Sequence, residues 1–122
     1  MKNNNRIRKS GNRIFVGKEQ ALIRDKNYLI LKLRQAWEQK PAIQYPVHAT
    51  FIFHFANFYT KQNKMNMRLG DLTNIIQLPE DCLQSAGVIQ DDCLIYSLDG
   101  SRKYPSKDDK NYIEIHLQKF TE

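Results

Sequence analysis

A strict alternation of side chains between residues 47 and 55 constrains the fold more than any other feature of the sequence. Every second position of this segment is apolar: Val47, Ala49, Phe51, Phe53 and Phe55. Successive side chains of a strand point to opposite faces of a sheet, so the spacing predicts a strand with one fully buried face. His48 and His54 occupy the other face. We interpret them as partly buried surface histidines, because six residues of strand separate them too far to share a metal ion.

Two helices are predicted from apolar residues at helical spacing. The first covers Lys18–Lys40 and ends at Pro41, and the second covers Leu72–Ala86 and ends at Gly87. Pro79 lacks an N–H group, so we expect it to kink or restart the second helix.

Three further strands complete the predicted sheet. They are expected at Arg13–Val16, Cys93–Leu98 and Tyr112–Leu117. The charged segment Asp99–Asn111 is expected to be a loop. The pattern therefore predicts an α/β (α+β) fold: one small domain spanning residues 1–122, with a mixed sheet of about four strands and two main helices.

Positive charge is concentrated in the first part of the chain. Residues 1–70 carry 14 Lys and Arg against three acids, whereas residues 71–122 carry five against ten. This division suits a polyanion-binding face beside a divalent-metal site. Folding could equally interleave the two parts into an ordinary mixed surface, and charge alone does not separate these readings.

Membrane insertion and secretion are not indicated. No apolar run approaches the ~20 residues that a membrane span requires, and the polar N-terminus lacks the apolar region of a secretory signal. The two cysteines, Cys82 and Cys93, do not have a metal-binding spacing. We therefore expect a reduced, cytoplasmic protein without a membrane partner.

Acidic residues flank the second predicted helix. Asp71 stands at its start, and Asp91 and Asp92 follow its end. A helix with a short return can bring such ends together, and carboxylate oxygens are the ligands that Mg²⁺ prefers. Taken alone the signal is weak, because Asp at a helix start is commonly a cap and an Asp pair before a strand is commonly a turn.

The spacing of residues 71–92 resembles the RusA family of Holliday junction resolvases, which are crossover junction endodeoxyribonucleases. That family reads D-x-D-N-L-x-K, then D-x-L, G and D-D before a strand. The matching positions, without insertion, are Asp71, Asn74, Ile75, Asp81, Leu83, Gly87, Asp91 and Asp92. The resemblance covers nearly the whole chain, although the family's first strand has no counterpart before Asn3.

The resemblance implies a Mg²⁺-dependent nuclease that acts in DNA recombination and repair as a homodimer on four-way junctions. Asp71, Asp91 and Asp92 would be catalytic, with Asp71 and Asp92 holding the metal. Two family positions are altered: Thr73 replaces an acid, and Gln77 replaces a lysine. We therefore expect either impaired cleavage or, as the alternative, an inactive protein that binds branched DNA through its basic N-terminal half.

Nearby charged residues are candidates to compensate for the two altered positions. The candidates are Glu80, Asp81, Lys64 and Lys103. Phosphate contacts are expected from a basic arm at residues 1–12, from the segment after the alternating strand and from the charged loop, where cations release the counterions of DNA. The predicted DNA-binding residues are Arg6, Arg8, Lys9, Arg13, Lys61, Lys64, Arg68 and Lys103.

Overall fold

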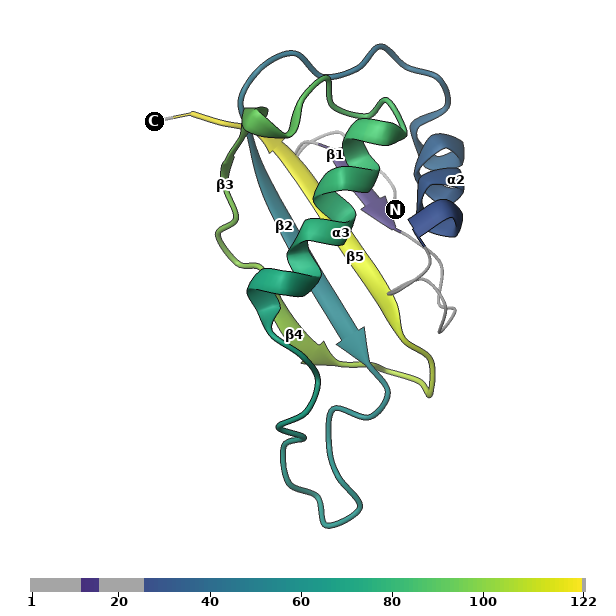
Figure 1. Cartoon of the computed structure of the whole chain (residues 1–122), viewed down its shortest axis with the longest axis vertical. Coiled ribbons are helices and arrows are strands. Elements are labelled where there is room, and N and C mark those ends of the chain that lie inside the picture. Colours follow the sequence, from purple (N-terminus) through teal and green to yellow (C-terminus); the bar gives the residue numbers. More distant parts are fainter. Residues whose placement is uncertain (1–11, 16–25, 122) are drawn as a thin grey trace, which may run out of the picture.

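A computed structural model describes residues 12–15 and 26–121, and it confirms a mixed α+β domain with two helices (Figure 1). The strands are β1 (Asn12–Phe15), β2 (Val47–Phe55), β3 (Ile95–Ser97), β4 (Arg102–Pro105) and β5 (Tyr112–Lys119). The helices are α2 (Lys26–Trp37) and α3 (Leu72–Ser85), and a short 3-10 turn, η2 (Asp92–Leu94), precedes β3.

The sheet is built around β2. Its neighbour β5 runs antiparallel to it from the pair Val47 and Lys119 to the pair His54 and Tyr112. On the far side of β5 lies β1, also antiparallel. On the other side of β2 lie β3, beside its start, and β4, beside its end, both parallel to it. The sheet is therefore mixed and four strands wide, with one edge divided between β3 and β4.

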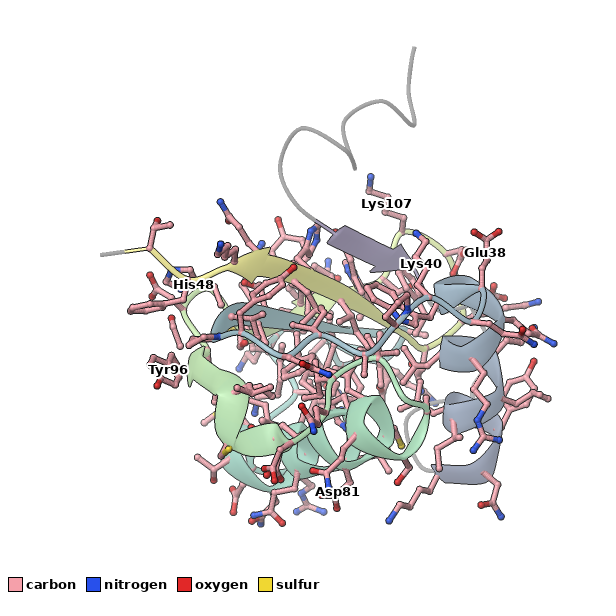
Figure 2. All side chains as sticks on the ribbon, turned by 90° about the horizontal axis from the view of Figure 1, so that it is seen from above. Glu38, Lys40, His48, Asp81, Tyr96 and Lys107 are labelled. Atoms are coloured by element: carbon pink, nitrogen blue, oxygen red, sulfur yellow. The ribbon has the colours of Figure 1, made fainter. Side chains whose placement is uncertain are left out.

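Both helices pack on the same side of the sheet, and the hydrophobic core lies between the helices and the sheet (Figures 1 and 2). The predicted buried face of β2 is confirmed, because Val47, Ala49, Phe51, Phe53 and Phe55 are all buried. From β5 the alternating residues Ile113, Ile115 and Leu117 join them. Alternation in the sequence thus fixes which side of the sheet receives the helices.

α2 contributes Leu29, Leu33 and Trp37 to the core at intervals of four residues. The described helix ends at Trp37, earlier than the predicted Lys40, because Glu38 and Gln39 adopt left-handed backbone angles with φ of 58° and 61°. Of the predicted helix, residues 18–25 lie outside the described residues. No helix in the described ranges is both long and apolar enough to cross a membrane.

α3 continues through Pro79, so the predicted restart there is wrong. Pro79 is buried together with Ile76, Cys82 and Leu83 on the face that meets the core. Burial of this apolar face offsets the hydrogen bond that the missing N–H group forgoes. The predicted stop is confirmed, since Gly87 has a left-handed φ of 78° directly after the helix.

The segment predicted as a loop at residues 99–111 contains a strand, which is a second correction. β4 pairs with β2 from Ile52 opposite Arg102 to Phe55 opposite Pro105. Main-chain pairing stabilises this edge strand, and its side chains are exposed or half-buried, so no apolar alternation marks it in the sequence. The preceding strand is correspondingly shorter than predicted, covering Ile95–Ser97 only.

The two histidines of β2 differ in burial. His48 is partly buried, as predicted, but His54 is buried, with 6% of its surface exposed. His54 Nε2 lies 3.1 Å from Glu114 Oε1, its Nδ1 lies 3.2 Å from the Pro105 carbonyl oxygen, and its ring stacks on Tyr112. β4 and β5 flank this end of β2 and cover the ring, which the sequence of β2 alone does not reveal.

Candidate active site

Asp71 lies directly before the first residue of α3 and keeps its carboxylate out of the helix cap. Its main-chain oxygen accepts the N–H groups of Asn74 and Ile75 at 3.1 Å each, but its side chain makes no capping hydrogen bond. The carboxylate is exposed and receives one long contact, 3.5 Å from Asn74 Nδ2 to Asp71 Oδ2. A carboxylate at this position commonly bonds the first N–H groups of the helix. Here its oxygens remain accessible to a ligand.

Thr73 and Gln77 occupy the first turns of α3, where both side chains are exposed. Residues four positions apart lie on the same helix face, so the two altered family positions share one surface close to Asp71. A threonine hydroxyl can bind water but carries no charge, and a glutamine amide donates hydrogen bonds without neutralising an anion. This surface therefore lacks the acid and the cation that the family pattern has there.

Lys103 supplies a positive charge next to this surface. Its Nζ donates a 2.9 Å hydrogen bond to the carbonyl oxygen of Gly70, the residue before Asp71. The contact exists because Lys103 belongs to β4, which pairs with the end of β2 and so passes the start of α3. Lys103 is one of the predicted DNA-binding residues, but it belongs to a strand and not to the predicted loop.

Asp91 and Asp92 lie at the other end of α3. Asp91 caps η2, because its Oδ1 accepts the Cys93 N–H at 2.8 Å, and this bond lowers the pKa of the Asp91 carboxyl. The Asp92 N–H donates to Gln84 Oε1 at 2.9 Å, which fixes Asp92 against the last turns of the helix. Asp91 therefore has a structural role as the cap of η2, in keeping with the turn that an Asp pair before a strand commonly forms.

Glu80 shares the neighbourhood of Asp92. Burial raises the pKa of Glu80 above its ordinary 4.5, and the negative charges of Asp92 and Asp81 raise it further. Asp81 points away from the sheet on the outer side of α3 (Figure 2). Of the four candidates for compensation, Lys103 thus lies near the Asp71 end of α3, and Glu80 lies near Asp92 at its other end.

The structure does not bring Asp71 and Asp92 together within one chain. From Asp71 to Gln84, the contact of Asp92, the axial rise of α3 is about 20 Å. Figure 1 shows the chain crossing the sheet as α3 before it returns to β3. Across residues 12–15 and 26–121, no three His, Cys, Asp or Glu side chains are placed to hold a metal ion. One chain by itself does not fit the carboxylate site that the resemblance implies.

The predicted DNA-binding residues other than Lys103 fall into three groups. Arg6, Arg8 and Lys9 lie outside the described residues, and Arg13 is placed by its backbone only, opposite His116 in the sheet. Lys61, Lys64 and Arg68 are exposed on the segment between β2 and α3. Because that segment ends at Gly70, it adjoins both Asp71 and Lys103.

Comparison with known proteins bears on the whole chain. No curated protein matches it. A protein-family model described as endodeoxyribonuclease RusA matches residues 1–118, which is nearly the full length. The chain therefore belongs to the RusA endodeoxyribonuclease family, and this membership supports a Holliday junction resolvase nuclease role on branched DNA.

Proposed function

We propose that this protein binds four-way DNA junctions and cleaves them weakly, in a reaction that requires Mg²⁺. The observation that carries the proposal is the exposed, uncapped carboxylate of Asp71 beside the Lys103 contact to Gly70. An accessible acid and a cation thus lie together where the basic segment between β2 and α3 ends. Thr73 and Gln77 on the adjoining helix face are the reason for expecting weak cleavage.

The fit to a metal ion is incomplete. RusA-family nucleases generally depend on a divalent metal, yet the described residues of one chain place no three suitable ligands together. Asp71 and Asp92 are the residues we propose as ligands, with Asp91 beside Asp92. Because one chain holds Asp71 and Asp92 at opposite ends of α3, a site that uses both needs two copies of the chain. Sites with few carboxylates bind Mg²⁺ with more water and less affinity. No catalytic step is therefore assigned to the ion.

DNA binding, as we propose it, needs only the protein's own basic side chains. Lys61, Lys64, Arg68 and Lys103 are the described candidates for phosphate contacts, and we extend the same role to Arg6, Arg8, Lys9 and Arg13. Such contacts gain affinity by releasing counterions and carry no base sequence information. Lys103 also offers positive charge near Asp71, where Gln77 cannot.

Resolution of a junction needs two symmetric cuts, so we propose a homodimer as the acting species. We place its work in the cytoplasm and in DNA recombination and repair.

The second candidate function is binding of branched DNA without cleavage. Thr73 and Gln77 favour it, because losing one electrostatic group of an active site typically costs about 10²–10³ in rate. Both side chains are exposed, so restoring the family residues should not disturb the fold.

A labelled synthetic four-way junction tests the two functions. The wild type is expected to bind it in EDTA and to cut it slowly in Mg²⁺, with paired cuts on opposed strands. Thr73→Asp with Gln77→Lys should raise the cleavage rate at least about 100-fold, and Asp92→Asn should abolish it. The exposed substitution Gln35→Lys serves as a charge control for Gln77→Lys.

Each outcome has a distinct meaning. Binding without cuts in the wild type, together with cuts in the double variant, would establish the binding protein and reject the weak nuclease. No binding to the junction under any condition would reject both functions.

A further inference from the structure

The segment between β2 and α3 forms an ordered hairpin at residues 57–69. Its arms are joined by Thr60 N–H to the Lys64 carbonyl at 2.7 Å and by Asn66 N–H to the Phe58 carbonyl at 2.8 Å. Between these bonds, Tyr59 and Met65 form an antiparallel bridge. Figure 1 shows the hairpin projecting from the body of the protein beyond the end of β2.

Both arms of the hairpin are anchored in the domain. Phe58 on the first arm and Leu69 on the second pack against the hydrophobic core. Asn66 Nδ2 donates to the Asn57 carbonyl at 3.0 Å, and the Lys103 contact to Gly70 fixes the point where the hairpin meets α3. The tip is therefore carried on a defined support, which reduces the entropy lost when it binds.

The hairpin exposes three large apolar side chains. Met67 is 92% exposed, Met65 63% and Tyr59 52%. Single exposed apolar residues are ordinary, but three on one short projection are not. Their position on a supported hairpin indicates a surface made for contact.

The charges around these apolar side chains identify the partner. Lys61, Lys64 and Arg68 are exposed on the same hairpin, and residues 57–69 contain no Asp or Glu. Exposed apolar side chains whose only charged neighbours on the hairpin are cations match a polyanion with apolar surfaces inside it. DNA is such a polyanion, with its phosphates outside and its base faces within. Methionine is among the side chains that proteins insert between base steps.

We propose that the hairpin inserts Met67, with Met65 beside it, between base pairs at the branch point of a DNA junction. The inference rests on the proposed function. An intact duplex buries its base faces on both sides, whereas separating bases costs least where pairing or stacking is already disturbed. The exposed methionines on the second arm of the hairpin would thus select the branch point, and Lys61, Lys64 and Arg68 would hold the neighbouring phosphates.

The test compares the wild type with the double variant Met65→Ala, Met67→Ala. One substrate is a four-way junction with 2-aminopurine at the branch point, and the other is a linear duplex with the same label. Leu31→Ala is the matched control, because Leu31 is also an exposed apolar residue, 48% exposed, but lies on α2.

Binding of the wild type and of Leu31→Ala should raise the 2-aminopurine fluorescence of the junction, which reports unstacking. The double variant should lose this rise and bind the junction about tenfold more weakly, as expected for one apolar side chain returned to water. Its affinity for the linear duplex should stay within about twofold of the wild type, since its cations are intact.

Three results would overturn the proposal. The first is an unchanged fluorescence rise in the double variant, with junction binding intact, which would leave the proposed function standing. The second is a dimer in the wild type that becomes a monomer in the double variant, which would make the hairpin a contact between copies of the chain. The third is a wild type that binds neither substrate, in which case the proposed function fails and the hairpin's role with it.

Discussion

The acidic residues around α3 differ in their hydrogen bonds and in their neighbouring charges, more than in residue type. Asp71 and Asp91 both precede a helical segment, yet Asp91 accepts the Cys93 N–H whereas Asp71 makes no such bond. Glu80, which the family pattern does not single out, lies near both Asp92 and Asp81, whose negative charges help to raise its pKa. A carboxylate held among other carboxylates costs stability when it ionises, so these residues differ in what their charges do to the fold.

Glu80→Gln is expected to stabilise the protein at neutral pH. The pKa of Glu80 is raised in the folded state above its ordinary 4.5, chiefly by burial and then by Asp92 and Asp81. An acid with a raised folded pKa costs stability above that pKa and costs nothing below the unfolded value. Thermal unfolding should show a gain of about 2 °C at pH 7 that shrinks as the pH falls towards 4.5.

The matched control for this prediction is Glu38→Gln, at the exposed end of α2 (Figure 2). It should leave the midpoint unchanged at both pH values. An equal gain from Glu80→Gln at pH 7 and at pH 4 would show that ionisation of Glu80 is not the cause.

At the scale of elements, β4 and the 57–69 hairpin give the Asp71 end of α3 its surroundings. β4 brings Lys103 to the Gly70 carbonyl, and the hairpin places three further cations on the approach to the same residue. Neither element shows an apolar pattern in its sequence. Main-chain pairing holds β4 and the arms of the hairpin in place instead. The candidate site is therefore assembled by backbone hydrogen bonds around one helix terminus.

Lys64→Ala should reduce the salt dependence of DNA binding without changing base preference. Each phosphate contact contributes about 0.9 to the slope of log K against log salt concentration. Fluorescence titrations of a duplex at several salt concentrations should give a slope lower by about one. Lys40→Ala, which follows α2 and lies away from the hairpin, should leave the slope unchanged. An equal reduction in both variants would show that Lys64 makes no specific phosphate contact.

At the scale of the whole molecule, one core connects the sheet to both helices. Phe51 of β2, Leu33 of α2 and Leu83 of α3 are fully buried in it. The opposite face of the sheet carries polar residues such as Glu114 and His116, which lie 2.5 Å apart between Oε2 and Nε2. A single layer of apolar side chains therefore separates α3 from the sheet.

Leu83→Ala is expected to cost about 2–5 kcal/mol of unfolding free energy, because the cavity left in a closed core relaxes only partly. That is a large share of the ~5–15 kcal/mol that stabilises a typical domain. Equilibrium unfolding in urea measures the loss, and Leu31→Ala on the exposed face of α2 should change stability by less than about 0.5 kcal/mol. A loss below about 1 kcal/mol for Leu83→Ala would contradict the close packing of Leu83 in the core.

The sequence by itself determined the elements whose burial is periodic. Alternation from Val47 to Phe55 defined the central strand and its buried face, and helical spacing located α3 through Leu83 to the stop at Gly87. The spacing from Asp71 to Asp92 was sufficient to identify the RusA family, and the match over residues 1–118 confirms it. Periodic burial and motif spacing are local properties of the chain, so they can be read without coordinates.

Only the tertiary structure decided what depends on main-chain pairing between distant segments. β4 was missed because its residues alternate in no apolar pattern, and with it were missed the burial of His54 and the Lys103 contact to Gly70. The separation of Asp71 from Asp92 also follows from the path of the chain, because α3 runs unbroken through Pro79 and holds them at its two ends. Sequence spacing counts residues along a helix, whereas a ligand site requires proximity in space.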